Sequence, residues 1–572
     1  WGLPILNTNR VNEFLPNASV SLQNKKGNLI EYKAVGYLRS DNFSGYKHQL
    51  SIKTDFGNWK LSQNWQFTHY NNKDWKGYFL KPQIQLNHTI KWFSNNLLQI
   101  DYLLERNIQQ TILTDTITPG SFSFSVFTAT IKSNIQAAKP WSLTYFTRSD
   151  QLPGGLKMLQ SDRSHNFQWQ YDGFSNEHHQ LKTAITYRSL TVQNANISNV
   201  QADKSLLSRI EYRLTELKNA LQLNVLYETG AGQEQRRDFS YIEVQQGRGE
   251  YMWIDYNNDG IQQLNEFEVA QFPDQAKFIR LFTPTNQFVK AAYSQLNYNF
   301  LFQPRNLWGV NPKSLLQKWL SKTQWQSSWQ SNAKQLATQQ LVSNPLPGKI
   351  PDSSLLTVNS ISNHTISINR FQRTWGLDLN WLQTEQKSLL TYGFEKRNVD
   401  EYTIKFRTIF YKQLAFEWLQ KWQNNQLQTP AFANRNFEIV GFQTEPKLSY
   451  VNGTVYRLQA SYQYIQRENI AQDGGQQAKI HSIITEAKWN MVQKNSLTAK
   501  FTYADIQLTG QPNTAVSFVM LNGLNTGRNF LWNIELTKRL GNSLEMMVQY
   551  EGRKPGNVPV IHIGRASIRA IF

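Results

Sequence analysis

Apolar and polar residues alternate one by one along several stretches of the chain. The clearest run spans 456–464, and others span 221–228, 497–503 and 59–67, where Gln63 breaks the apolar row. Successive side chains of a β-strand point to opposite faces, so each run predicts a strand with one apolar and one polar face. Each run is close to the roughly 10 residues that a tilted strand needs to cross a membrane. In the first run the apolar positions are Tyr456, Leu458, Ala460, Tyr462 and Tyr464.

Alternating segments follow one another along the whole chain, and we estimate their number at about two dozen. We therefore predict an all-β fold: a single large transmembrane antiparallel β-barrel of roughly 22–26 strands with an irregular inserted segment. An open sheet edge would leave backbone groups unpaired in lipid, so all strands are assigned to one closed barrel. The predicted parts are 1–246 and 288–572, which form the barrel, and 247–287, which forms the insert. The same alternation also allows one or more large soluble β-sandwich domains.

The composition favours the membrane barrel. Aromatic residues make up 13% of the 572 residues, yet the mean hydropathy is −0.55 and only 18% of residues are charged. A barrel has this balance because half of each strand faces lipid and half faces a wet lumen, with aromatic girdles at the interfaces. No apolar run approaches the roughly 20 residues of a membrane-spanning helix. Since the chain has no cysteine, disulfides and cysteine-ligated metals are excluded.

The last strand is predicted over 561–572, where the chain ends on an aromatic residue. This ending resembles the closing strand of bacterial outer-membrane β-barrels, whose terminal aromatic residue is read by the assembly machinery. The resemblance implies that the chain resides in the outer membrane of a Gram-negative bacterium. Every second residue counted back from Phe572 is apolar or small: Ala570, Ile568, Ala566 and Gly564. The residues between them, on the opposite face, include Arg565 and Arg569.

Turn signals give an expected orientation. Asn452-Gly453 and the segment 540–542 predict short turns, whereas the joints at 467–477, 508–528 and 552–560 are long. Outer-membrane barrels keep short turns on the periplasmic side and long loops outside. The three long joints are therefore expected to be extracellular.

The position of the insert follows from counting strands back from the carboxyl terminus. On that count the run 292–300 travels outward and the run near 239–244 travels inward. The insert would then lie at the periplasmic mouth or fold into the lumen, with the proline-rich stretch 342–356 on the same side. The chain opens at Trp1 with neither a methionine nor a secretion signal, so we expect a processed or partial amino terminus.

The insert carries the most specific motif of the sequence. From Asp255 to Glu266 the chain reads DYNNDGIQQLNE, which matches D-x-[DN]-x-[DN]-G-x5-E, the EF-hand calcium loop. In such a loop, oxygens at the first, third and fifth positions converge on one hard cation and the final glutamate supplies two more. The alternative is an Asx-rich turn without metal. The expected ligands of one Ca²⁺ are the side chains of Asp255, Asn257, Asp259 and Glu266 and the backbone carbonyl of Ile261.

The helices of an EF-hand pair are not evident around this loop. Tyr251–Ile254 predicts a strand, and 267–277 predicts at most a short helix before Pro273 interrupts it. The loop is therefore more similar to the isolated calcium loops of dockerin-type or thrombospondin-type repeats. Glu268 is a further carboxylate nearby.

Two segments carry a wider resemblance. The sequence GRGEYMWIDYNNDG at 247–260, followed by NEFE at 265–268, resembles large outer-membrane proteins of Bacteroidota-type bacteria, as does the closing HIGRASIRAIF at 562–572. The resemblance implies the fold and the compartment. It implies no substrate and no activity.

Catalytic motifs for common hydrolases, phosphate-binding loops and dinucleotide-binding loops are missing from the sequence, so we expect no enzyme. His178 and His179 are adjacent, so on a strand they face opposite sides and cannot share a metal. Three functions stay open. The favoured one is a structural or accessory subunit of a multi-protein outer-membrane complex, with calcium bracing the insert. The others are a transport pore for solute or polypeptide gated by the insert, and a rim-located hydrolase.

The net charge of +19, from 60 basic and 41 acidic residues, bears on the partners. Arginines and lysines at the outer rim are expected to attract lipopolysaccharide phosphates, while others line a polar lumen. No module for nucleic acid is recognisable, so we expect none as a partner. The expected partners are outer-membrane lipid and lipopolysaccharide, together with other outer-membrane or periplasmic proteins.

Overall fold

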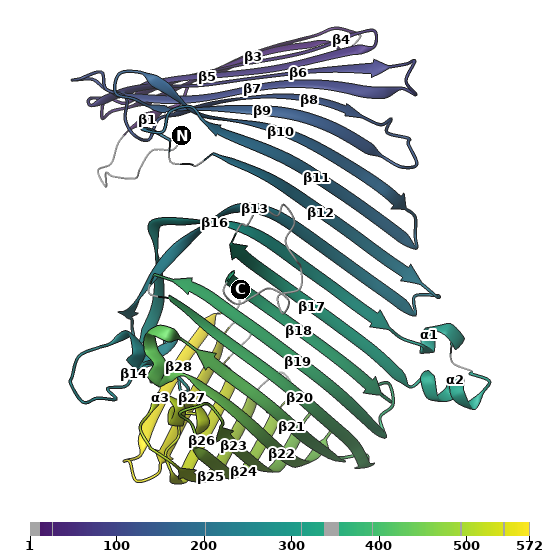
Figure 1. Cartoon of the computed structure of the whole chain (residues 1–572), viewed down its shortest axis with the longest axis vertical. Helices are drawn as coiled ribbons and strands as arrows, with labels where there is room; N and C mark the ends of the chain where they lie inside the picture. Colours follow the sequence, from purple (N-terminus) through teal and green to yellow (C-terminus); the bar gives the residue numbers. More distant parts are fainter. Residues whose placement is uncertain are drawn as a thin grey trace. The chain divides into compact units, whose positions relative to one another are not determined.

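The computed structural model is built almost wholly from β-strands (Figure 1). It describes residues 12–25, 27–198, 200, 202–309, 312–336, 354–391, 393–491, 495–540 and 544–570. The chain divides into two compact units, residues 1–212 with 228–231 and residues 213–227 with 232–572. None of the helices in the described ranges is long and apolar enough to cross a membrane. Phe572 and most of the stretch 342–356 lie outside the described residues.

The first unit is an antiparallel sheet in which strands adjacent in sequence pair with each other. The pairing runs in order from β3 to β11, and both β1 and β2 pair with β3. An aromatic row crosses this sheet through Tyr32, His48, Phe67 and Tyr78, with ring centroids 6.1, 6.5 and 6.3 Å apart. The strands are β1 (Glu13–Phe14), β2 (Asn17–Gln23), β3 (Leu29–Arg39), β4 (Ser44–Phe56), β5 (Trp59–Asn71), β6 (Trp75–Ile90), β7 (Asn96–Thr111), β8 (Phe122–Lys132), β9 (Trp141–Pro153), β10 (Met158–Ser175), β11 (His179–Val192) and most of β12 (Asp203–Glu216).

The second unit begins around β13 (Leu221–Glu243) and holds the insert and the remaining strands. From β16 to β28, twelve successive antiparallel pairings join the strands in sequence order. These strands are β16 (Phe278–Phe302), β17 (Thr323–Leu336), β18 (Leu355–Ile368), β19 (Trp375–Leu390), β20 (Gly393–Tyr411), β21 (Leu414–Gln428), β22 (Phe437–Asn452), β23 (Tyr456–Asn469), β24 (Gln477–Met491), β25 (Asn495–Thr509), β26 (Gly527–Arg539), β27 (Leu544–Pro555) and β28 (Ile561–Ala570).

The strand count agrees with the alternation pattern. Of the 28 strands in the described residues, β1, β14 and β15 have only two or three residues, and the other 25 have seven or more. Among the pairings that the described residues make, all are antiparallel except the parallel bridge between Arg237 and Leu390. The helices are short: α1 (Arg305–Trp308), α2 (Leu315–Leu320) and α3 (Ala515–Met520). The predicted fold class is therefore confirmed as an all-β, antiparallel fold with an inserted segment.

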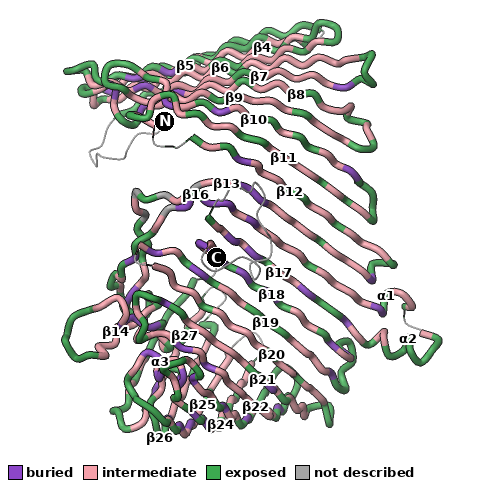
Figure 2. The backbone as a smooth tube through the Cα atoms, in the orientation of Figure 1, coloured by how far each residue is buried: buried purple, intermediate pink, exposed green. Residues whose placement is uncertain are grey.

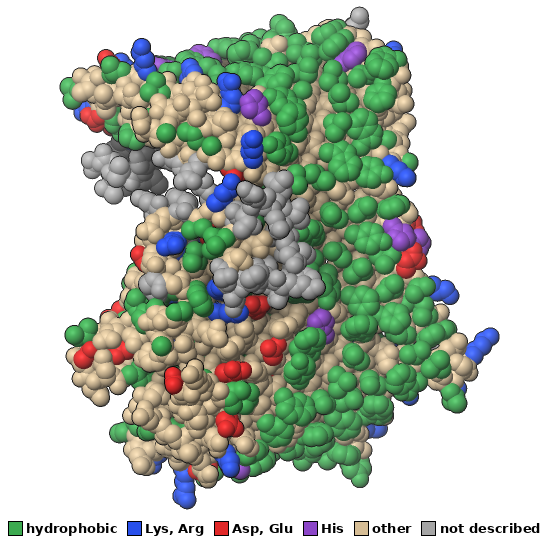
Figure 3. Space-filling model, viewed as in Figure 1, with side chains coloured by type: hydrophobic (Ala, Val, Ile, Leu, Met, Phe, Trp, Pro, Cys, Tyr) green, Lys and Arg blue, Asp and Glu red, His purple; other side chains and the backbone are tan. Residues whose placement is uncertain are grey.

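One face of the second unit is apolar and exposed. A row of aromatic side chains crosses four strands at directly opposite positions, Trp381, Tyr402, Trp422 and Phe442. Trp422 is 42% exposed and Tyr402 is 51% exposed. Figure 3 shows apolar side chains in green gathered over these strands. Leaving such a side chain in water forgoes about 1.5–3 kcal/mol relative to burial, so water is a poor solvent for this face.

The opposite face is polar and carries ion pairs between neighbouring strands. Glu417 on β21 accepts from Lys405 on β20 at 2.9 Å and from Lys447 on β22 at 3.5 Å. Lys421 and Glu401 form another pair across the same strands, at 3.2 Å. Most strand residues are of intermediate burial, as expected for a single sheet layer with both faces accessible (Figure 2). The two faces match the two rows that the alternation predicts.

Part of the polar face becomes apolar near one end of the strands, and helix α3 covers it. Ile439, Ile465, Ile480 and Ile506 form a buried cluster there with residues of the α3 segment. Thr514 caps the helix by accepting a hydrogen bond from the backbone N–H of Ser517 at 3.1 Å. We call this end, which carries the joints 470–476, 510–526 and 556–560, the loop end. The other end carries the short joints 412–413 and 453–455, together with the longer joint 303–322 that holds α1 and α2, and is called the turn end.

The direction of the strands corrects the expected place of the insert. Because twelve antiparallel pairings separate β16 from β28, both strands run in the same direction, from the loop end to the turn end. The prediction that 292–300 and the closing strand run in opposite directions is therefore wrong. The insert lies at the loop end, over residues 244–277, and β16 already begins at Phe278. The strand signal of a barrel is weak in each segment, so a count based on alternation alone can miss one reversal.

Candidate functional site

The insert is a small hairpin between two long strands. β14 (Tyr251–Trp253) pairs antiparallel with β15 (Phe267–Val269), and Tyr251 also pairs with Phe278 at the start of β16. The strand expected at Tyr251–Ile254 is thus present. The short helix considered for 267–277 is absent from these described residues: a strand begins that segment, because Phe267 and Val269 alternate with Glu268 and find partners on β14.

Between the two strands, the predicted calcium loop has the turns that its sequence favours. Gly260 has φ +71° and Asn258 has φ +57°, a region in which glycine and asparagine are the most tolerated residues. The Asp255 carboxylate accepts hydrogen bonds from the N–H groups of Asp259 at 3.2 Å and Gly260 at 2.9 Å. The Asp259 carboxylate accepts one from Ile261 N–H at 2.7 Å. These Asx-type turns direct the Asp255 and Asp259 carboxylates toward the backbone of the loop.

Glu266 closes the loop from a short 3₁₀ helix, η1 (Leu264–Glu266). Its carboxylate is 1% exposed and accepts a hydrogen bond from the indole N–H of Trp253 at 2.9 Å. Among the described residues, no three histidine or acidic side chains are gathered as around a metal ion. The residues present are oxygen donors that suit a hard cation, with Asn257 and the Ile261 carbonyl completing the set. The calcium ligands therefore stay a prediction.

Aromatic side chains attach the base of the insert to the strands. Phe267 is 3% exposed and stacks on Tyr241 of β13, with ring centroids 4.0 Å apart and planes 10° from parallel. The ring of Phe278 meets that of Phe267 edge-on at 5.0 Å. Such pairs add about 0.5–1.5 kcal/mol beyond the burial of their area.

Two buried ion pairs attach the insert to segments far away in sequence. Arg553 on β27 forms a two-pronged pair with Asp274, at 2.5 and 2.6 Å, and lies over the ring of Phe272 at 4.2 Å. Arg435, in the 3₁₀ helix η3 (Pro430–Arg435), pairs with Glu268 at 3.3 Å. Removing one partner of a buried pair leaves an uncompensated charge and typically costs about 3–5 kcal/mol.

The loop that follows α3 also passes close to the insert. Gly523 has φ +71°, and a Cβ atom at this position would lie 2.8 Å from the Cγ atom of Gln271. The backbone therefore needs glycine here for both its conformation and the close approach. Figure 1 shows β14 and α3 at the same end of the unit.

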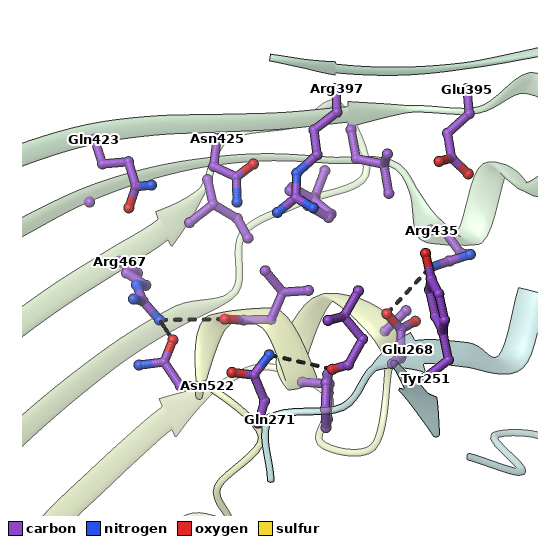
Figure 4. A pocket seen from close by; sticks show the side chains of 18 of the residues that line it. Tyr251, Glu268, Gln271, Glu395, Arg397, Gln423, Asn425, Arg435, Arg467 and Asn522 are labelled. Atoms are coloured by element: carbon purple, nitrogen blue, oxygen red, sulfur yellow. Dashed lines mark hydrogen bonds and ion pairs between the residues drawn. The ribbon is translucent and has the colours of Figure 1, made fainter. Parts of the chain in front are cut away.

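A cavity of about 290 Å³ lies between the insert, α3 and the polar face of β20–β23 (Figure 4). Its floor is the strand wall, from which Glu395, Arg397, Gln423 and Asn425 project, and its opposite side is formed by the insert and α3. Part of the lining is apolar, including Leu427 and Phe437. The charged side chains that line it are Arg280, Arg397, Arg435, Arg467, Glu268 and Glu395.

Burial changes the acid–base properties of the insert residues beside this cavity. Burial raises the pKa of the Glu268 carboxyl to about 7, against the opposing effect of Arg435 and Arg397. Burial also raises the pKa of the Tyr256 hydroxyl well above its usual range, and the charge of Glu268 adds to this. The Tyr256 hydroxyl is buried without a hydrogen-bond partner in the described part of the chain.

The cavity was not predicted from the sequence, which singled out only Glu268, as a spare carboxylate. Its arginines come from β16, β20, η3 and β23, so up to 187 positions of chain separate them. Glu395 and Arg397 are two residues apart on β20, so both lie on one face of that strand. This spacing does not show which strands lie beneath the insert, or which of their faces it covers.

Comparisons with known proteins give distant likenesses only. No family model matches the chain, and no curated protein matches it in sequence. Among solved structures, a mutant of the ferric enterobactin receptor PfeA from Pseudomonas aeruginosa matches 92% of this chain and 85% of its own, with 8% identity and a TM-score of 0.35. The FrpB iron transporter from Neisseria meningitidis matches 99% of this chain and 82% of its own, with 8% identity and a TM-score of 0.31. The copper transporter OprC matches 95% of this chain and 74% of its own, with 8% identity and a TM-score of 0.29. At these values the likeness assigns neither a family nor an activity to the chain.

Proposed function

We propose that this chain is an integral β-barrel of the Gram-negative outer membrane that transports a solute, with the insert obstructing the lumen at the loop end. The observation that carries the proposal is the position of the insert. It lies against the polar face of the strands, held by buried ion pairs, with a charged cavity beneath it. A solute that enters a lumen from the loop end would meet this cavity.

The exposed apolar face supports the membrane part of the proposal. Lipid tails would cover side chains such as Trp418 and Ile483, which are 41% and 51% exposed. Closure of the strands into one barrel would then leave no unpaired edge in lipid. A lumen enclosed by about two dozen strands is wide enough to need filling or gating, which the insert and α3 would supply.

The orientation follows from the loop lengths. With the long joints outside, the loop end is extracellular, and the insert then stands at the extracellular mouth of the lumen rather than at the periplasmic one. Basic residues at the rim would face lipopolysaccharide phosphates, in keeping with the net charge of +19. Calcium, bound at Asp255, Asn257, Asp259, Ile261 and Glu266, would brace the insert by binding only its folded form.

Conductance across planar bilayers tests the transport function. The parent protein is expected to conduct weakly, and the variant Asp274→Asn is expected to conduct severalfold more, because the buried ion pair between the insert and Arg553 is lost. Glu250→Gln, an exposed substitution in the same insert, is the control and should behave as the parent. Absence of channels from both the parent and the folded Asp274→Asn variant would contradict the transport function.

A structural or accessory role in a multi-protein complex is the second candidate. The observation in its favour is the firm attachment of the insert, by two buried ion pairs and an aromatic stack, which suits a fixed seat for a partner better than a moving gate. Co-purification of an outer-membrane or periplasmic protein under mild detergent, together with no conductance, would favour this role. The rim-located hydrolase gains no support, since the described residues that line the cavity include no serine, threonine, cysteine or histidine.

A further inference from the structure

We infer that the cavity beneath the insert binds a small solute through an oxyanion group, a carboxylate or a phosphate. The inference deepens the proposed transport function by naming the chemical class of its solute. It starts from the charges around the cavity, where four arginines face two glutamates. The local balance is therefore positive even when both glutamates are ionised.

In the described part of the chain, two of the four arginines form no ion pair with an acidic side chain. The guanidinium of Arg467 donates to neutral acceptors of the α3 segment, the carbonyl of Met520 at 2.6 Å and the side chain of Asn522 at 2.9 Å. Arg397 is exposed, and no hydrogen bond or ion pair joins it to another described residue. Figure 4 shows its side chain extending from the strand wall toward the cavity. Arg397 is therefore available to a ligand.

The paired arginines also keep unused donors. Arg280 bonds to Glu395 through Nη1 at 3.2 Å, but its Nε and Nη2 atoms are buried without an acceptor in the described residues. The Nε atom of Arg435 is likewise buried without an acceptor in the described residues. A guanidinium has five N–H donors in a fixed planar fork, and leaving them unpaired in a buried site is costly. Oxyanions supply acceptors of matching geometry.

Rigid surroundings hold one of these guanidinium groups in place. Arg280 lies over the ring of Phe239 at 3.8 Å and near that of Phe282 at 5.0 Å. Its position is therefore set before any ligand arrives, which reduces the entropy lost on binding.

The acceptors and the size of the cavity limit the rest of the ligand. Glu268 Oε1 and Asn425 Oδ1 are buried without a donor in the described part, so a ligand with hydroxyl groups would satisfy them. The volume of about 290 Å³ is at the lower end of small-molecule sites, which span about 300–1,000 Å³. These features fit a small hydroxylated acid or phosphate ester rather than a polymer.

Isothermal titration of the full chain in detergent tests the inference, with citrate and inorganic phosphate as anionic probes and glucose as the neutral one. At least one anion is expected to bind and glucose is not. Arg397→Gln should weaken binding tenfold or more, because a charge-assisted contact is lost, and Arg397→Lys should restore part of it. The matched control is Arg457→Gln, on the same polar face but near the turn end, roughly 33 Å from Arg467 along β23.

Failure of both anions to bind the folded parent would overturn the inference, as would binding of the same strength by folded Arg397→Gln. Folding of each variant is checked by circular dichroism before titration. Because binding is measured without a membrane, the result is independent of conductance. A protein that conducts without binding either anion loses only the oxyanion site, and one that binds without conducting loses only the transport function.

Discussion

Several histidine side chains on the strands are paired with tyrosine hydroxyls of a neighbouring strand. His48, His165, His481 and His562 each have Nδ1 within 2.7–2.9 Å of such a hydroxyl. In every case the tyrosine stands two positions away from the residue directly opposite the histidine. The pairing satisfies a polar ring atom on a face that is otherwise apolar. The alternation pattern alone does not predict these hydrogen bonds, because the pattern treats histidine simply as a polar residue.

The pair Tyr462–His481 allows a double-variant test of this contact. Tyr462→Phe is expected to lower the free energy of unfolding by about 1–3 kcal/mol, because the ring nitrogen of His481 loses its partner. Adding His481→Phe to that variant should recover much of the loss, since no unpaired polar atom is left. Urea unfolding followed by tryptophan fluorescence measures both effects. Strictly additive losses would mean that the hydrogen bond contributes nothing.

Glu268 gives a second prediction at the scale of one residue. Its folded pKa of about 7 exceeds the usual 4.5, so the folded insert holds the proton more tightly than the unfolded one. The stability that this provides is complete below about pH 4.5 and is lost as the pH rises through 7, about 3 kcal/mol in all. The charged and titratable groups facing the carboxyl are Arg435, Arg397, Glu395 and Tyr256.

Limited proteolysis of residues 244–277 at a series of pH values measures this effect. The parent insert should become more sensitive between pH 5 and pH 8 than that of Glu268→Gln, which lacks the titrating group. Comparing the two proteins at each pH cancels the pH dependence of the protease, and Glu250→Gln serves as a control. Parallel profiles for parent and Glu268→Gln would show that this carboxyl does not govern the attachment.

At the scale of elements, local patterns were predictable and long-range contacts were not. Strand faces and the hairpin strand at Tyr251–Trp253 follow from nearest-neighbour geometry, so the sequence was sufficient for them. The attachment of the insert depends on Arg435 and Glu268, 167 positions apart, and on Arg553 and Asp274, 279 positions apart. No spacing rule covers such distances, because they depend on which strands the insert meets.

The calcium loop is the element whose chemistry is most directly testable. Asp259→Ala with Glu266→Ala should make 244–277 protease-sensitive and abolish any calcium-dependent protection, while the strands stay folded by circular dichroism. Because Glu266 also accepts from Trp253 and Asp259 also accepts from Ile261, both substitutions remove hydrogen bonds of the loop, and the calcium-dependent part of the protection is the measure of metal binding. Calcium added to the parent should protect the insert, and a chelator should remove that protection. If the parent insert resists the protease equally well with calcium and with chelator, the loop is an Asx-rich turn that binds no metal.

For the molecule as a whole, the all-β class was predictable while the side occupied by the insert was not. Alternation repeats in every strand, so one misjudged segment scarcely affects the class. The direction of a strand depends on whether the number of chain reversals counted before it is odd or even. One missed strand therefore inverts the expected direction of every strand beyond it in the count. The twelve pairings from β16 to β28 settle the direction within the second unit and bring the insert to the end that holds the loops 470–476 and 556–560.

Epitope tags on intact cells test the resulting arrangement. Tags placed at 470–476, at 556–560 and next to Asn258 in the calcium loop should all be labelled or all be hidden together, since the three sites share one end of the strands. With long loops outside, we expect all three to be labelled and a tag at 453–455 to be reached only after the outer membrane is permeabilised. Labelling at 453–455 alone would invert the orientation but keep the insert with the long loops. A third outcome is that the long loops are labelled on intact cells but the insert is not, although its tag is reached after denaturation. That result would place the insert deep in the lumen, where the surrounding wall shields it from antibody.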